Sequence, residues 1–161
     1  GLSDLGHQQA RSVGEASQHL VPRKVQILSS PKARALETAK PLAETLSRDI
    51  DISEAFVEIT APVPLAERQT WLRGFMTQSW PEQADSLWLW RKGIIDALLE
   101  IQRPTVIFSH FLVINTVMAH ISRQHATVQL LPDNGSHHQF RSGDGRLEVV
   151  QLGRELDTLV N

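Results

Sequence analysis

Two short segments that follow apolar stretches of the sequence contain polar side chains that could bind and react with a phosphate group. Residues 29–34 (Ser-Ser-Pro-Lys-Ala-Arg) come where an apolar segment ends and a helical pattern begins. The free N–H groups of a helix N-terminus, its dipole and the nearby Arg34 suit a bound phosphate. Ser109 and His110 end a second apolar segment, so His110 is expected to face a crevice, because ligands of open α/β sheets bind beyond the carboxyl ends of strands.

Each of these residues also has a plain structural interpretation. His110 could serve only as a structural hydrogen-bonding group, and Arg34 could be a surface residue of its helix. Glu58, in the segment Phe-Val-Glu-Ile, could be a solvated carboxylate at a strand edge. The four tryptophans are more typical of packing than of substrate recognition, and the remaining histidines show no metal-ligand spacing. The sequence also lacks the Gly-x-Ser-x-Gly, Walker and Gly-x-Gly-x-x-Gly motifs.

The composition is that of a globular protein with no marked charge. Hydrophobic residues make up 41% of the 161 residues and charged residues 21%, which excludes a disordered or fibrous chain. A net charge of −2 argues against nucleic acid as a partner, and no apolar segment is long enough to span a membrane. With no cysteine, thiolate catalysis and cysteine-ligated zinc are excluded, and we expect a reducing, cytoplasmic location.

Alternating apolar periodicities predict the elements that must position these residues. We expect helix 5–19, strand 24–29, helix 31–48, strand 50–59, helix 86–102, strand 105–110, helix 111–123 and a hairpin with arms 137–141 and 146–152 around the loop 142–145. Strands alternating with helices, followed by a terminal hairpin, predict a three-layer α/β/α sandwich. Its sheet should be mainly parallel, with some antiparallel pairing near the C-terminus.

Three motifs, in this order, resemble the histidine phosphatase superfamily, also called phosphoglycerate mutase-like. They are residues 2–10 (LSDLGHQQA), 29–39 (SSPKARALETA) and 106–110 (VIFSH), and residues 134–136 (Asn-Gly-Ser) resemble the family's C-terminal segment. The resemblance covers essentially the whole chain, so residues 1–161 are expected to form one domain with the family's fold. It favours a phosphatase over a mutase, because the chain is short.

The resemblance also implies roles for particular residues. Arg34 matches an arginine and His110 a histidine that surround the phosphoryl group, and Glu58 resembles the carboxylic acid that protonates the leaving oxygen. Asp85 is the alternative acid. The implied substrate is a small phosphorylated molecule, and the implied reaction uses no metal and no organic cofactor.

The family's Arg-His-Gly motif, which carries the nucleophilic histidine on the first strand, is absent from the sequence. We expect it upstream of Gly1, either in a longer protein or in a clipped piece that stays bound. Without that strand beside segment 105–108, buried N–H and C=O groups would be left unpaired, at about 1–3 kcal/mol each. The complete protein is therefore expected to be a phosphomonoester phosphatase that forms a phosphohistidine, while residues 1–161 alone are expected to be inactive. The alternative is a catalytically inactive, phosphatase-like binding or scaffold module.

The segment 65–90 is the longest irregular stretch of the sequence and is rich in Trp, Arg and Phe. Because it follows the expected acid, we expect it to form a cap over the pocket. Arg68 and Arg73 are candidates to bind an anionic substrate, although both could equally be surface charges of the cap.

Overall fold

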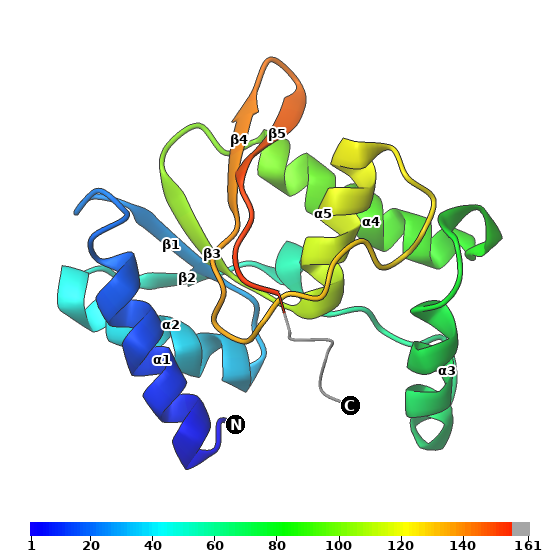
Figure 1. The fold of residues 1–161 in the computed structure, drawn as a ribbon, viewed down its shortest axis with the longest axis horizontal. Coiled ribbons are helices and arrows are strands. Elements are labelled where there is room, and N and C mark those ends of the chain that lie inside the picture. Colours follow the sequence, from blue (N-terminus) through cyan, green and yellow to red (C-terminus); the bar gives the residue numbers. More distant parts are fainter. Residues whose placement is uncertain (156–161) are drawn as a thin grey trace.

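A three-stranded parallel sheet in the order β2–β1–β3 lies at the centre of the fold (Figure 1). The computed structural model describes residues 1–155. Its strands are β1 (Gln26–Ser29), β2 (Ile50–Ile52) and β3 (Thr105–Phe108). Ser29 is in register with the last residue of β2 and with the last residue of β3. All three strands therefore end at the same edge of the sheet.

Two pairs of helices cover the two faces of this sheet. Helices α1 (Asp4–Ser17) and α2 (Ala33–Leu46) lie on one side, and α4 (Asp85–Leu99) and α5 (Phe111–Ser122) lie on the other (Figure 1). The side chain of Ser3 caps α1 by accepting the N–H of Gly6, as a residue preceding a first helical turn commonly does. The expected helices are thus present, with ends that differ by a few residues.

The strand side chains alternate between the two helical layers. Ile27 and Phe108 belong to the buried apolar cluster that includes α2. Their neighbours Leu28 and Ile107 pack against the cluster formed by α4 and α5. Successive side chains of a strand point to opposite faces, so one short sheet supports a core on each side. The predicted three-layer α/β/α architecture is confirmed.

The C-terminal hairpin forms a second, antiparallel sheet. Strands β4 (Gln139–Gly143) and β5 (Arg146–Gln151) are joined by Asp144 and Gly145, whose φ angles of 53° and 72° are both positive. A two-residue turn of this kind matches the right-handed twist of paired strands. The expected hairpin is therefore confirmed, but its loop is shorter than the expected 142–145, because Ser142 and Gly143 belong to β4.

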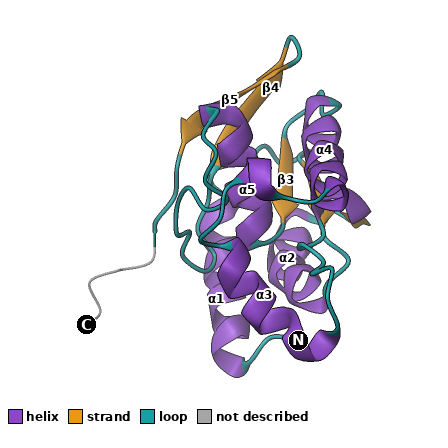
Figure 2. Cartoon of the chain, turned by 90° about the vertical axis from the view of Figure 1, so that its right-hand side faces the viewer, coloured by secondary structure: helices purple, strands orange, loops and turns teal. Residues whose placement is uncertain are grey.

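Within the described residues, β3 has a strand on one side only. It pairs with β1, whereas β4 and β5 pair with each other, and Figure 2 shows the hairpin and β3 as separate strands. Phe140 and Leu147 of the hairpin pack against the α4–α5 cluster. Although three of its four residues are apolar, β3 is buried only at Phe108.

The strand predicted over residues 50–59 is wrong beyond Ile52. The N–H of Ser53 bonds to the Ser29 carbonyl at 2.8 Å, and a 3-10 helix, η1 (Glu54–Phe56), then turns the chain away from the sheet. This turn places Phe56, which is 2% exposed, in the apolar cluster with Ile94 of α4. Burial of a large aromatic side chain therefore outweighs the β-forming pattern of the sequence.

The segment that precedes α4 consists of short helical pieces. It forms η2 (Leu65–Glu67), α3 (Arg68–Phe75) and η3 (Trp80–Glu82). Aromatic rings hold these pieces together: Phe75 stacks on Trp71 and meets Trp80 edge to face, with ring centroids 5.2 and 5.8 Å apart. Trp80 is 1% exposed, which agrees with the packing role expected of the tryptophans.

Candidate active site

The register of β1 and β3 brings the residues that follow them into contact. The N–H of Ser30 bonds to the carbonyl of Phe108 at 3.0 Å, so the two chains leave the sheet side by side. His110 is the N-cap residue of α5 and is 5% exposed. Its Nε2 lies 2.7 Å from Oγ of the fully buried Ser30.

Glu58 reaches the same place from the segment that follows β2. Its Oε1 accepts the N–H of Ile59 at 3.1 Å, and its Oε2 accepts the N–H of Leu112 at 3.4 Å. Leu112 lies in the first turn of α5, directly after the N-cap residue His110 and Phe111. The carboxyl group of Glu58 thus occupies the N-terminus of the helix that begins at His110, where free N–H groups are available.

Two side-chain hydrogen bonds hold the backbone that carries Glu58. The hydroxyl of Ser109 donates to the Phe56 carbonyl at 2.8 Å, and the indole N–H of Trp90 donates to the Val57 carbonyl at 3.0 Å. Sequence reasoning missed both roles, and it treated Trp90 only as a packing residue. The position of Ser109 beside His110 at a strand end was the one available signal.

Basic side chains surround His110 and Glu58. Arg34 lies exposed in the first turn of α2, and its positive charge lowers the pKa of both His110 and Glu58. Lys32, which precedes the same helix, also lowers the pKa of His110, and Arg68 lowers that of Glu58. These three cations come from two separate segments of the sequence.

Burial sets the protonation states of the two central groups. Desolvation of the imidazole, together with the charges of Arg34 and Lys32, lowers the pKa of His110 to about 4. Burial raises the pKa of Glu58 above its ordinary value, against the opposing effects of its two backbone hydrogen bonds and of Arg34 and Arg68. At neutral pH the site therefore combines a neutral imidazole with a carboxyl group that holds its proton more tightly than usual. Such a set can bind an anion and supply a proton.

The structure brings Arg34, Glu58 and His110 to the carboxyl edge of the sheet, and the other candidates lie on α3 and α4. Arg68 begins α3, and its charge reaches Glu58. Arg73 is exposed in the last turn of α3, and none of its hydrogen bonds or ion pairs within the described residues joins it to Glu58 or His110. Asp85 is exposed in the first turn of α4. Of the two candidate acids, Glu58 is the one that contacts α5 beside His110.

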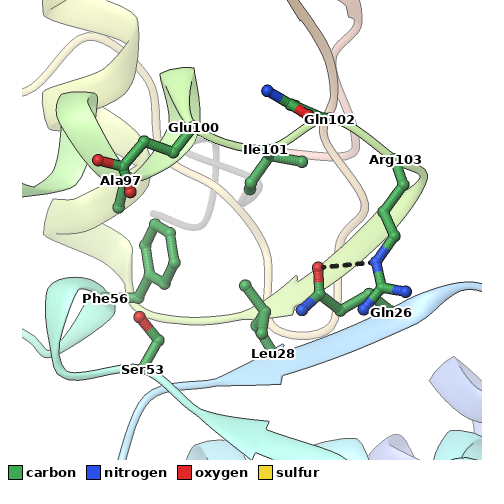
Figure 3. A pocket seen from close by; sticks show the side chains of 9 residues that line it. All are labelled: Gln26, Leu28, Ser53, Phe56, Ala97, Glu100, Ile101, Gln102 and Arg103. Carbon is green, nitrogen blue, oxygen red and sulfur yellow. Dashed lines mark hydrogen bonds between the residues drawn. The ribbon is translucent and has the colours of Figure 1, made fainter.

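A cavity of about 480 Å³ lies elsewhere, on the α4 face of the sheet (Figure 3). It is lined by Gln26 and Leu28 of β1, by Ser53 and Phe56, and by Ala97 and residues 100–103, and Arg103 Nε donates to Gln26 Oε1 at 3.4 Å. None of the residues that surround His110 lines this cavity. It is separate from the candidate active site.

Two of the other histidines, His137 and His138, have hydrogen-bond partners away from the candidate active site. His137 Nε2 bonds to Ser17 Oγ, and His138 bonds to Ser136 Oγ and accepts the N–H of Gly153. Across residues 1–155, no group of three or more His, Asp or Glu side chains is arranged to hold a metal ion.

The fold and the site together define an α/β protein of the phosphoglycerate mutase-like type, and comparison with known proteins agrees. The phosphoserine phosphatase of Entamoeba histolytica, solved with 3-phosphoglyceric acid, superimposes with a TM-score of 0.68 at 20% identity, covering 95% of this chain and 84% of that one. The mycobacterial glucosyl-3-phosphoglycerate phosphatase, solved with VO3, gives a TM-score of 0.67 at 18% identity, covering 94% and 86%.

Residues 1–155 match the sequence profile of the histidine phosphatase superfamily (branch 1). The chain belongs to this superfamily. No curated protein matches its sequence.

Proposed function

We propose that the protein is a phosphomonoester phosphatase that works through a phosphohistidine intermediate. The observation that carries this proposal is the convergence of Arg34, Glu58 and His110 at one sheet edge, in a chain that belongs to the histidine phosphatase superfamily. The roles proposed for these residues are those that the resemblance to the superfamily implies, and the chemistry of each side chain suits its role.

Arg34 and His110 bind the oxygens of the transferring phosphoryl group. A guanidinium and a neutral N–H donor stabilise the charge on those oxygens in the transition state. The nucleophilic nitrogen of a second histidine forms a bond to phosphorus as the bond from phosphorus to the leaving oxygen breaks. Glu58 gives its proton to that oxygen, and its raised pKa favours the protonated form that this step requires. Water then attacks the phosphohistidine, Glu58 takes up a proton from it, and inorganic phosphate leaves.

The nucleophilic histidine comes, in this proposal, from a strand that precedes Gly1 and pairs with the edge of β3 that has no partner strand within residues 1–155. The position of the chain's first residues supports this. The N–H of Leu2 donates to Glu37 Oε2 at 2.5 Å, and Glu37 lies one helical turn beyond Arg34. A strand parallel to β3 would end at the carboxyl edge of the sheet, near Arg34, and could lead directly into Gly1. Residues 1–161 would then be a single domain that lacks its first strand.

The substrate is proposed to be a small phosphorylated molecule, and segment 65–90 is proposed to cap it. The structurally similar E. histolytica enzyme was solved with 3-phosphoglyceric acid, which carries a carboxylate as well as a phosphate. Arg68 is proposed to bind such a second anionic group, and its effect on the pKa of Glu58 supports this. None of the described helices is long and apolar enough to cross a bilayer. With no cysteine in the sequence, we propose a reducing, cytoplasmic location.

The substitution Glu58→Gln tests the proposal in the protein that includes the upstream segment. It removes the proton donor, so hydrolysis of an alkyl phosphate should fall by about a hundredfold or more, whereas p-nitrophenyl phosphate, whose leaving group hardly needs a proton, should be affected far less. Glu54→Gln is the matched control, because Glu54 is an exposed carboxylate four residues earlier in the same segment. Acid-labile labelling of a histidine by the substrate's phosphate would mark the intermediate.

Equal losses on the two substrates would contradict the role of Glu58. Binding of phosphorylated ligands with no turnover at all would overturn the phosphatase proposal and favour the inactive binding module instead.

A further inference from the structure

Ser30 is the most completely buried polar side chain in direct contact with the candidate active site. It is 0% exposed, follows β1 directly and lies 2.7 Å from Nε2 of His110. Its hydroxyl also accepts the backbone N–H of Lys32 at 3.2 Å. Its neighbour Ser29 is equally buried, but Ser29 Oγ donates to the carbonyl of Ser30 and has no hydrogen bond to His110.

The donors and acceptors around Ser30 determine whether Ser30 or His110 donates the proton in their hydrogen bond. A serine hydroxyl has one proton to donate and two lone pairs to accept. If Nε2–H donated to Ser30, both lone pairs would be used, since Lys32 already occupies one, and the hydroxyl proton would need another acceptor. Within residues 1–155 the Ser30 hydroxyl has no hydrogen-bond partner besides Lys32 N–H and His110 Nε2. A fully buried hydroxyl proton without an acceptor is unfavourable.

The opposite arrangement satisfies the buried Ser30 hydroxyl. The Ser30 hydroxyl donates to an unprotonated Nε2, accepts from Lys32, and leaves the ring proton of His110 on Nδ1. Nδ1 has no hydrogen-bond partner within residues 1–155, so its proton is available to a bound anionic group. The imidazole is neutral because its burial and the charges of Arg34 and Lys32 disfavour the imidazolium.

We propose that Ser30 is a positioning residue, whose hydroxyl holds His110 in the Nδ1–H tautomer so that Nδ1–H can donate to an anionic oxygen of the substrate. The role in catalysis rests on the phosphatase function proposed above, whereas the tautomer does not. A hydrogen bond to one ring nitrogen sets which nitrogen carries the proton. Without the Ser30 hydroxyl, the ring could place its proton on either nitrogen and could rotate. The Nδ1–H donor would then be present in only part of the molecules.

Three charged or titratable groups face His110 and must be considered with it. Lys32 and Arg34 are cations at the start of α2, and Glu58 lies across the N-terminus of α5. None of them is hydrogen-bonded to the imidazole in the described chain. The tautomer is therefore set by Ser30, while these groups set the overall charge of the ring.

The tautomer can be read by NMR of the full chain labelled with ¹⁵N at histidine. We expect Nδ1 of His110 at the protonated position and Nε2 at the unprotonated position near neutral pH. In Ser30→Ala the two signals should move toward an averaged state, and the affinity for inorganic phosphate should fall by up to about tenfold. Ser29→Ala, which deletes an equally buried hydroxyl, should change neither.

A wild-type His110 with its proton on Nε2 would overturn the proposal, and this result needs no variant to fold. An unchanged tautomer and an unchanged phosphate affinity in Ser30→Ala would also overturn it. Ser30→Ala should lower kcat for phosphomonoester hydrolysis, with little change for Ser29→Ala. If the protein hydrolyses no phosphomonoester while His110 shows the expected tautomer, the phosphatase proposal fails and the pairing of Ser30 with His110 stands.

Discussion

The burial of His110 predicts a pH dependence of folding that one substitution should remove. In the unfolded chain this histidine has its ordinary pKa of 6.5, whereas burial, Arg34 and Lys32 lower the pKa to about 4 in the folded protein. As the pH falls below 6.5, the unfolded chain takes up a proton at His110 that the folded protein does not. The free energy of unfolding therefore falls with falling pH, down to the folded pKa. Between about pH 7.5 and about pH 4.5 the loss from this residue amounts to roughly 2–3 kcal/mol.

The substitution His110→Gln removes the titrating group and keeps a polar side chain. Urea unfolding, followed by tryptophan fluorescence at steps of pH, gives the free energy of unfolding for the wild type and the variant. We expect His110→Gln to be less stable at neutral pH, but to lose roughly 2–3 kcal/mol less than the wild type on acidification. His120, His137 and His138, whose pKa values burial also lowers, are present in both proteins, so their contributions cancel in the difference. Parallel pH curves for the two proteins would refute the argument, because they would show that His110 titrates alike in the folded and unfolded states.

Two further predictions concern the surroundings of Glu58. Trp90→Phe removes the donor to the Val57 carbonyl and should lower stability by about 1 kcal/mol. It should also slow hydrolysis of alkyl phosphates more than of aryl phosphates, with Trp88→Phe on the same helix as control. Arg68→Ala removes a charge that lowers the pKa of Glu58. Because Glu58 must be protonated to act, the alkaline limb of the pH–rate profile should move to higher pH. Arg73→Ala should leave that limb in place, and a shift of equal size in both arginine variants would show that Arg68 acts only as a distant surface charge.

Local features of the sequence determined most of the secondary structure. The caps, turn residues and apolar periodicities act over a few residues, so the helix that Ser3 begins and the turn at Asp144 and Gly145 could be predicted from their neighbours alone. The expectation that His110 and Arg34 share one sheet edge also needed only the alternation of strands and helices. In a parallel sheet, the residues that follow the strands all emerge on the same side.

Only the tertiary structure decided how those residues are supported. The adjacency of β1 and β3 brings Ser30 against His110, and no local pattern specifies which strands are neighbours. The hydrogen bond from Trp90 to the backbone beside Glu58 likewise joins two segments that are far apart in the sequence.

The segment that carries Glu58 is where the secondary structure departs most from the one predicted from the sequence. Its apolar, alternating residues favour a strand, yet the chain turns after Ile52, because burying Phe56 against α4 outweighs local β propensity. That turn takes Glu58 from a predicted strand edge, where it would be solvated, to the N-terminus of α5, where burial raises its pKa. The sequence by itself thus determined which residue types stand at the strand ends. The packing of distant segments decided which of those residues are buried and hydrogen-bonded, and therefore in which protonation state they stand.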